Sequence, residues 1–387
     1  MANYFRGSTT ANAVEYKCGD NIRFELELVH DGKTMSCPLF LVETWGDDGR
    51  QSRRFIPGEN GKLTFDTSLE KPGFVHVLVT ACALDGAPLE GVDKFEGGAG
   101  AELDKITQGR PDPEDFDDFW KKQLETVESS PLTILEKKEI DSGDPDYAAY
   151  DIKLAAPGDM PASGILTMPK NAAPGSLTAI LAFHGYGFSP AEVNRVPGAI
   201  FLRMNIHGFE NNRDQAYYDD FAKTHAGFGF EHDKNQKPDT CYFLNVILRD
   251  LQGARLIRSL PEYDGKGITL NGGSMGAMQA TNIAALINDA KLLDILIPWL
   301  CDLGGLDKNR LRGWRPDPEP GVLYFDTAIM AKRVKCPVKI ECGLGDYVCP
   351  PSGETVLWHN IKTPKSITFV QNMTHPYRPI ERIDYTL

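Results

Sequence analysis

The sequence predicts an α/β protein with a mostly parallel central sheet, preceded by a small all-β sandwich domain. Three observations lead to this prediction. The first hundred residues contain short strand patterns separated by turn residues, without a helical stretch. From about residue 150, strand and helix patterns alternate. The run at residues 178–183 is continuously apolar, as in parallel strands that are covered on both faces. We therefore expect a β-sandwich accessory domain over residues 1–100 and an α/β domain over residues 101–387.

Composition narrows the classes of partner. The chain has 387 residues, of which 41% are hydrophobic and 25% charged, and this balance is typical of a globular protein. Its formal net charge of −13 repels phosphate backbones and anionic membranes. Nucleic acid and membranes are therefore not expected as partners, whereas a neutral small molecule is.

Cysteine spacing and the motifs that the sequence lacks bear on cofactors and on the cellular compartment. The eight cysteines form no cluster with zinc-ligand spacing, so we expect reduced thiols and no metal. The sequence contains no dinucleotide or Walker motif, so we expect no cofactor. No signal peptide precedes the β patterns, and no apolar run approaches the ~18 residues of a membrane span. These features predict a cytoplasmic protein, although a trimmed secreted or periplasmic form would look the same.

The elements of the N-terminal half follow in order. Residues 22–28 alternate between apolar and charged side chains, which predicts a half-buried strand. Asp31 and Gly32 then predict a tight hairpin turn. Further strand patterns lie at residues 39–42, 63–65 and 74–79. The glycine-rich residues 96–100 are expected to be flexible.

The C-terminal half opens with a leading helical segment at about residues 111–128. Prolines and acids at residues 111–115 suit the first turn of a helix. Phe116, Phe119 and Trp120 follow at helical spacing. Beyond it we expect strands at residues 178–183, 267–270, 293–300, 338–342 and 367–370, and helices at residues 244–260, 275–287 and 352–360.

The strongest functional motif is Gly-Gly-Ser-Met-Gly at residues 272–276, between an expected strand and an expected helix. This context is that of a nucleophile elbow, in which glycines allow a serine to occupy a tight, strained turn. We therefore predict Ser274 as a catalytic nucleophile in an α/β-hydrolase fold.

A serine hydroxyl is a weak nucleophile, so a base and an orienting acid must accompany it. In this fold they follow the serine in the order acid, histidine. His375 comes just after the last expected strand, whereas His359 falls within an expected helix, so we favour His375 as the base. Asp346 follows the strand at residues 338–342 within a glycine-rich loop, and we favour it over Asp302 as the acid.

Two backbone amides are expected to form the oxyanion hole. One is that of Met275, immediately after the nucleophile, and the other that of Tyr186, in the loop after the strand at residues 178–183. His184 in the same loop is expected to be structural, and Asp302 to shape the site or cap a helix.

Several segments together resemble the family of acetyl xylan esterases and cephalosporin-C deacetylases, which are carbohydrate esterases. The resemblance extends from about Pro111 to the C-terminus. It includes residues 113–120, His-Gly-Tyr at 184–186, Gly-Gly-Ser at 272–274, Pro-Trp-Leu-Cys-Asp at 298–302, and Gly-Leu-Gly-Asp at 343–346 with Cys-Pro-Pro-Ser at 349–352. It implies deacetylation of short acetylated sugars through an acetyl-enzyme, with Ser274, Asp346 and His375 as the triad.

The sequence departs from the family pattern at several points. Met275 stands where the family has Gln, residues 207–209 read His-Gly-Phe where Arg-Gly-Gln is expected nearby, and Pro376 replaces a Glu. Compact members of the family also lack the N-terminal β patterns. The chain therefore resembles a divergent branch, for which a homo-oligomer is an open alternative.

Other functions remain open at this point. A β-sandwich ahead of a hydrolase also resembles acyl-CoA thioesterases and some serine peptidases. A different class of protein is a non-catalytic carbohydrate-binding protein with a decayed hydrolase domain, in which Trp45 could stack on sugars.

Overall fold

A computed structural model describes residues 3–387 and begins with two four-stranded antiparallel sheets, here called the N-terminal β region (residues 3–101). One sheet contains β1 (Asn3–Thr9), β2 (Ile22–His30), β3 (Lys33–Thr34) and β6 (Lys62–Thr67). The other contains β4 (Leu39–Gly46), β5 (Gln51–Pro57), β7 (Gly73–Cys82) and β8 (Phe95–Ala101). The predicted all-β start of the fold is confirmed. Whether this region is a separate domain ending at residue 100 stays a prediction.

The predicted hairpin after β2 is confirmed, but the expectation of a flexible segment at residues 96–100 is wrong. Asp31 and Gly32 have φ values of 47° and 75°, as a tight hairpin turn requires. Residues 96–100 instead belong to β8. Its glycines serve close packing, because a Cβ on Gly98 would lie 2.5 Å from the Val75 carbonyl oxygen and 2.9 Å from that of Leu344.

The remainder of the chain forms a mixed ten-stranded sheet in the order β18-β17-β16-β15-β14-β12-β13-β11-β10-β9. Six neighbouring strands, from β17 to β13 in this order, run parallel. The strands are β9 (Ile134–Ile140), β10 (Tyr147–Leu154), β11 (Ala162–Pro169), β12 (Leu177–Phe183), β13 (Ala199–Met204), β14 (Tyr263–Gly273), β15 (Ala290–Leu296), β16 (Val338–Gly343), β17 (Lys365–Val370) and β18 (Asp384–Thr386). The predicted mostly parallel central sheet is therefore confirmed.

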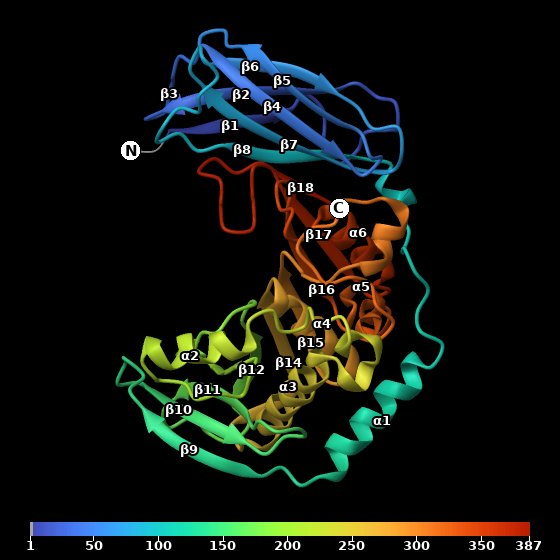
Figure 1. The fold of residues 1–387 in the computed structure, drawn as a ribbon. Coiled ribbons are helices and arrows are strands. Elements are labelled where there is room, and N and C mark those ends of the chain that lie inside the picture. Colours follow the sequence, from blue (N-terminus) through green and yellow to red (C-terminus); the bar gives the residue numbers. More distant parts are fainter. Residues whose placement is uncertain (1–2) are drawn as a thin grey trace.

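Helices cover this sheet along its length (Figure 1). They are α1 (Phe116–Ser129), α2 (Gln215–His225), α3 (Tyr242–Ser259), α4 (Met275–Leu286), α5 (Thr327–Met330) and α6 (Pro351–Asn360). The leading helix begins at Phe116 rather than near residue 111. Asp112 instead forms ion pairs with Lys332 and Arg333 at 2.7 Å each, which hold the preceding segment as a connector.

The strand expected at residues 293–300 ends at Leu296. Ile297 and Leu300 have φ values of 43° and 61°, and this left-handed backbone cannot continue a strand. All eight cysteines are free in the structure. Within residues 3–387, no helix combines the length and apolar character needed to cross a membrane.

The N-terminal β region lies against the end of the sheet that carries β16, β17 and β18, far from β9 (Figure 1). Gln371, directly after β17, makes the main polar contact. Its side-chain amide donates to the Gly98 carbonyl oxygen at 3.0 Å and to Ser8 Oγ at 2.9 Å, and its side-chain oxygen accepts from the Gly98 amide at 2.9 Å. Because Gln371 is buried, these bonds satisfy groups that water does not reach.

We expect Gln371→Leu to lower the free energy of unfolding by about 2–4 kcal/mol, because it leaves the buried amide and carbonyl of Gly98 without partners. Chemical denaturation monitored by circular dichroism measures the change. Gln51→Leu, at an exposed position in β5, is the matched control. Equal stability of the two variants would contradict the assigned role of Gln371.

Candidate active site

Ser274 occupies a strained turn between β14 and α4. Its φ and ψ angles are 55° and −123°, a conformation that non-glycine residues rarely adopt. Glycines around it permit the tight packing: a Cβ on Gly276 would lie 2.3 Å from the Phe183 carbonyl oxygen, and one on Gly272 would lie 2.3 Å from Gly276 itself. This local geometry is that of a nucleophile elbow.

Asp346 and His375 meet at the carboxyl ends of β16 and β17. The distance from Asp346 Oδ2 to His375 Nδ1 is 2.9 Å. The other carboxylate oxygen, Oδ1, accepts from the amides of Val348 and Cys349, also at 2.9 Å each, so the buried carboxylate is fixed in orientation. Since an ionised carboxylate only accepts hydrogen bonds, Nδ1 of His375 carries the proton and Nε2 is left to accept one.

Ser274 and His375 are not hydrogen-bonded to each other within residues 3–387, and catalytic bonds of this kind are often loose before substrate binds. Cys349 lies in the same cluster, since ligand atoms of Asp346, Cys349 and His375 lie within 4.8 Å of one another. Such a trio has the residue types of a metal site. However, burial raises the pKa of the Cys349 thiol well above its usual value, and the neighbouring Ser274 hydroxyl lowers it only in part. The hydrogen bond between Asp346 and His375 is the arrangement that proton transfer by a histidine requires.

The loop after β12 lies beside the nucleophile. A Cβ on Gly185 would come within 3.7 Å of the Ser274 Cβ. Within residues 3–387, the amides of Tyr186 and Met275 donate no hydrogen bond outside regular elements, which leaves both for an incoming oxygen. Burial lowers the pKa of His184 to about 4, and its Nδ1 lies 2.9 Å from the Gly185 carbonyl oxygen. His184 is therefore neutral near pH 7 and shapes the loop.

His207 also supports this loop, and the sequence analysis missed its role. Its Nε2 lies 3.0 Å from the Gly187 carbonyl oxygen and its Nδ1 2.6 Å from the Tyr242 hydroxyl. Because a carbonyl only accepts, Nε2 carries the proton and Nδ1 accepts from Tyr242. Burial lowers the pKa of His207 to about 3, which keeps this arrangement at neutral pH. The departure from the family pattern at residues 207–209 would have drawn attention to it.

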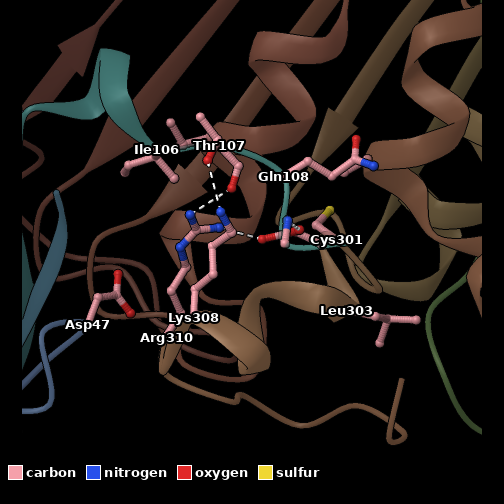
Figure 2. A network of polar contacts seen from close by, with 12 residues as sticks. Asp47, Ile106, Thr107, Gln108, Cys301, Leu303, Lys308 and Arg310 are labelled. Atoms are coloured by element: carbon pink, nitrogen blue, oxygen red, sulfur yellow. Dashed lines mark hydrogen bonds and ion pairs between the residues drawn. The ribbon is translucent and has the colours of Figure 1, made fainter. Parts of the chain in front are cut away.

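Asp302 contacts neither the histidine nor the serine by hydrogen bonds but anchors the chain behind them. It forms a buried ion pair with Arg310 at 2.6 Å and accepts from the Gly109 amide at 2.7 Å. Figure 2 shows Arg310 pointing toward Thr107, whose carbonyl oxygen accepts from Arg310 Nη2 at 2.7 Å. Asp302 thus joins the loop after β15 to the segment that precedes α1.

The N-terminal β region reaches the loop that carries Asp346. The His76 ring stacks on the ring of Tyr347, next to Asp346, with 3.7 Å between centroids and 18° between planes. A Cβ on Gly345 would lie 1.8 Å from the Glu96 carbonyl oxygen, so only glycine allows this approach. The sequence alone did not indicate this contact.

Glu354 on α6 is a second buried carboxyl group close to Asp346. Within residues 3–387, neither of its side-chain oxygens has a hydrogen-bond partner. Burial raises the pKa of Glu354 well above its usual value, and the charge of Asp346 raises it further. The surroundings of Glu354 therefore favour its neutral, protonated form.

This environment makes stability depend on pH. The unfolded chain releases the Glu354 proton above the ordinary pKa of 4.5, whereas the folded state keeps it to higher pH. The contribution of Glu354 to the free energy of unfolding is therefore most favourable below pH 4.5, and it is lost as pH rises towards the raised pKa. Glu354→Gln removes this titration. The free energy of unfolding of the variant, relative to that of the wild type, should therefore rise by up to about 1.4 kcal/mol for each pH unit in this window. Denaturation from pH 5 to pH 8 measures the gain. A difference that does not change with pH, as expected for exposed Glu125→Gln, would contradict it.

Comparisons with known proteins agree on one family. Residues 100–306 and 321–384 match the model of the family described as Acetyl xylan esterase (AXE1). The chain is 26% identical to acetyl esterase Axe7A of Xylanibacter ruminicola over 329 aligned residues. This alignment covers 79% of this chain and 72% of that protein.

Two solved structures share the fold. The acetyl xylan esterase from Paenibacillus sp. R4 is 23% identical, with a TM-score of 0.56, over 71% of this chain and 93% of that chain. Acetyl xylan esterase 1 from Thermoanaerobacterium sp. JW/SL YS485 is also 23% identical, with a TM-score of 0.59, over 72% of this chain and 93% of that chain. The predicted α/β-hydrolase fold is thereby confirmed, and the family match covers well over half of the chain. The chain belongs to the acetyl xylan esterase (AXE1) family of carboxylesterases.

Proposed function

We propose that this protein is a serine esterase that removes acetyl or other short acyl groups from neutral esters such as acetylated carbohydrates. The observation that carries the proposal is the strained turn of Ser274, at φ 55° and ψ −123° between β14 and α4. Such strain persists at functional sites, where the surrounding structure overdetermines it. Membership of an esterase family supports the same chemistry.

The proposed reaction proceeds in two steps. His375 Nε2 takes the proton of Ser274 Oγ as this oxygen forms a bond to the ester carbonyl carbon. The amides of Tyr186 and Met275 stabilise the negative oxygen of the tetrahedral intermediate. The bond to the leaving alcohol then breaks, and His375 gives its proton to the alcohol oxygen. Water repeats the sequence on the acyl-enzyme and releases the free acid and Ser274.

Each side chain has one task in this scheme. The Asp346 carboxylate holds Nδ1–H of His375 at 2.9 Å and stabilises the imidazolium that forms in each step. The net charge of −13 favours uncharged substrates over anionic ones. An acetylated sugar fits this requirement, as does another small neutral ester.

We expect Ser274→Ala to lower kcat for p-nitrophenyl acetate by on the order of 10³-fold or more, because the nucleophile is lost while the oxyanion donors remain. Assays with p-nitrophenyl acetate and butyrate, on wild type and variant, measure the loss and the preferred acyl length. Ser129→Ala, at an exposed position, is the matched control. Undiminished activity of Ser274→Ala would refute the serine mechanism.

Asp346→Asn is expected to lower kcat by on the order of 10³- to 10⁴-fold, because the amide no longer enforces the tautomer of His375 that leaves Nε2 free. The measurement is kcat for p-nitrophenyl acetate, with circular dichroism to verify folding. Asp302→Asn tests the rival acid. It should lower the melting temperature through the loss of the Arg310 pair, with a much smaller effect on kcat. The opposite ranking would identify Asp302 as the catalytic acid.

A further inference from the structure

The loop at residues 307–320 brings a tryptophan to the candidate active site. The match to the family model is interrupted at this loop, since it covers residues 100–306 and 321–384. We propose that Trp314 forms a subsite in which its ring stacks on the pyranose ring of an acetylated sugar. This inference rests on the proposed function and specifies the part of the substrate that lies beyond the acetyl group.

Hydrogen bonds attach the loop both to the N-terminal β region and to the segment that follows Asp346. The Leu311 amide donates to Asp47 Oδ1 of the N-terminal β region at 2.8 Å. The Trp314 amide donates to the Val348 carbonyl oxygen at 3.0 Å, two residues beyond Asp346. The Trp314 carbonyl oxygen accepts from Trp299 Nε1 at 2.6 Å. These bonds fix the backbone of Trp314, so its ring is presented from a rigid position.

Close packing holds the loop at Gly313 as well. Gly313 has a φ of 67°, and a Cβ there would lie 2.5 Å from Pro350 Cδ and 2.7 Å from the Val348 carbonyl oxygen. The loop therefore lies directly on the segment that follows Asp346.

The ring of Trp314 is partly packed and partly open. Its centroid lies 4.7 Å from that of Tyr186, at an interplanar angle of 87°, and 4.8 Å from that of Phe230. Even so, 43% of Trp314 is exposed. An aromatic ring that is fixed by neighbouring rings and still open to solvent loses little entropy when a ligand stacks on it.

The position of this ring relates it to the chemistry. Tyr186 is the proposed oxyanion donor, and Trp314 contacts its side chain. Trp299, which is hydrogen-bonded to Trp314, also contacts the nucleophile: the Trp299 amide donates to the Ser274 carbonyl oxygen at 3.2 Å. In the proposed binding mode, an ester whose carbonyl oxygen binds at the Tyr186 amide places its alcohol part near the Trp314 ring. The alcohol of an acetylated sugar is a pyranose, whose C–H face fits an aromatic plane.

The experiment compares two acetyl esters, an acetylated methyl xylopyranoside and ethyl acetate, which share the acyl group and differ in the ring. We expect Trp314→Leu to lower the ratio of their kcat/KM values by about 10- to 100-fold, mainly through KM for the xylopyranoside. Leucine keeps apolar bulk but has no planar face. Trp314→Phe should restore much of the ratio, and Phe55→Leu, another exposed aromatic position, should leave the ratio unchanged.

A second measurement separates this inference from the proposed function. Calorimetric titration of the Ser274→Ala protein with deacetylated xylo-oligosaccharide reports ring binding without turnover, and adding Trp314→Leu should weaken it by about the same factor. Full esterase activity in Ser274→Ala alone would refute the proposed function, while the calorimetric comparison would still test the ring subsite. An unchanged kcat/KM ratio in Trp314→Leu, with Ser274→Ala inactive, would overturn the subsite and leave the esterase proposal standing.

Discussion

The contact between β8 and the loops after β16 and β17 constrains the rest of the structure. These loops carry Asp346 and His375, and both lie against the same strand. Gly345 lies directly on the Glu96 carbonyl, and Gln371 exchanges hydrogen bonds with Gly98. The N-terminal β region therefore holds the acid and the histidine in one position relative to each other. Such fixed positions suit the proposed catalytic roles of both residues, because no reorganisation is then needed during a reaction.

Strained backbone occurs directly after the neighbouring strands β14 and β15, and nearby hydrogen bonds stabilise it. Ser274, Ile297 and Leu300 all have positive φ values, and each residue in such a conformation costs about 1–3 kcal/mol. Hydrogen bonds join the two strained segments: the Ser274 amide donates to the Leu296 carbonyl oxygen at 3.0 Å, and the Trp299 amide donates to the Ser274 carbonyl oxygen at 3.2 Å. The turn that exposes Ser274 and the bend after β15 thus stabilise each other.

Most of the elements that could be predicted from the sequence have local sequence patterns. The parallel strands and the elbow at Ser274 have short-range signatures, so β12, β14 and α4 were expected. Features that depend on contacts between distant residues were not. Glycines at residues 96–100 look flexible in isolation, whereas contacts with Val75, Leu344 and Gln371, distant in the sequence, show why β8 needs them. The polar strand β9, exposed at the sheet edge, offers no apolar period.

The same reasoning explains how the chain can depart from its family without losing the local geometry around Ser274. Met275 and Pro376 adjoin the nucleophile and the histidine, whereas the departures at residues 207–209 and in the N-terminal β region lie in what supports the site. His207 holds the Gly187 carbonyl where the family pattern differs, and the N-terminal β region supports the loops from outside the matched residues. Asp47 of that region also holds Leu311, in the loop that the family model does not match. Because the N-terminal β region contacts both the loops of Asp346 and His375 and the loop at residues 307–320, we expect a change in its sequence to alter the proposed sugar subsite while Asp346 and His375 keep their hydrogen bond.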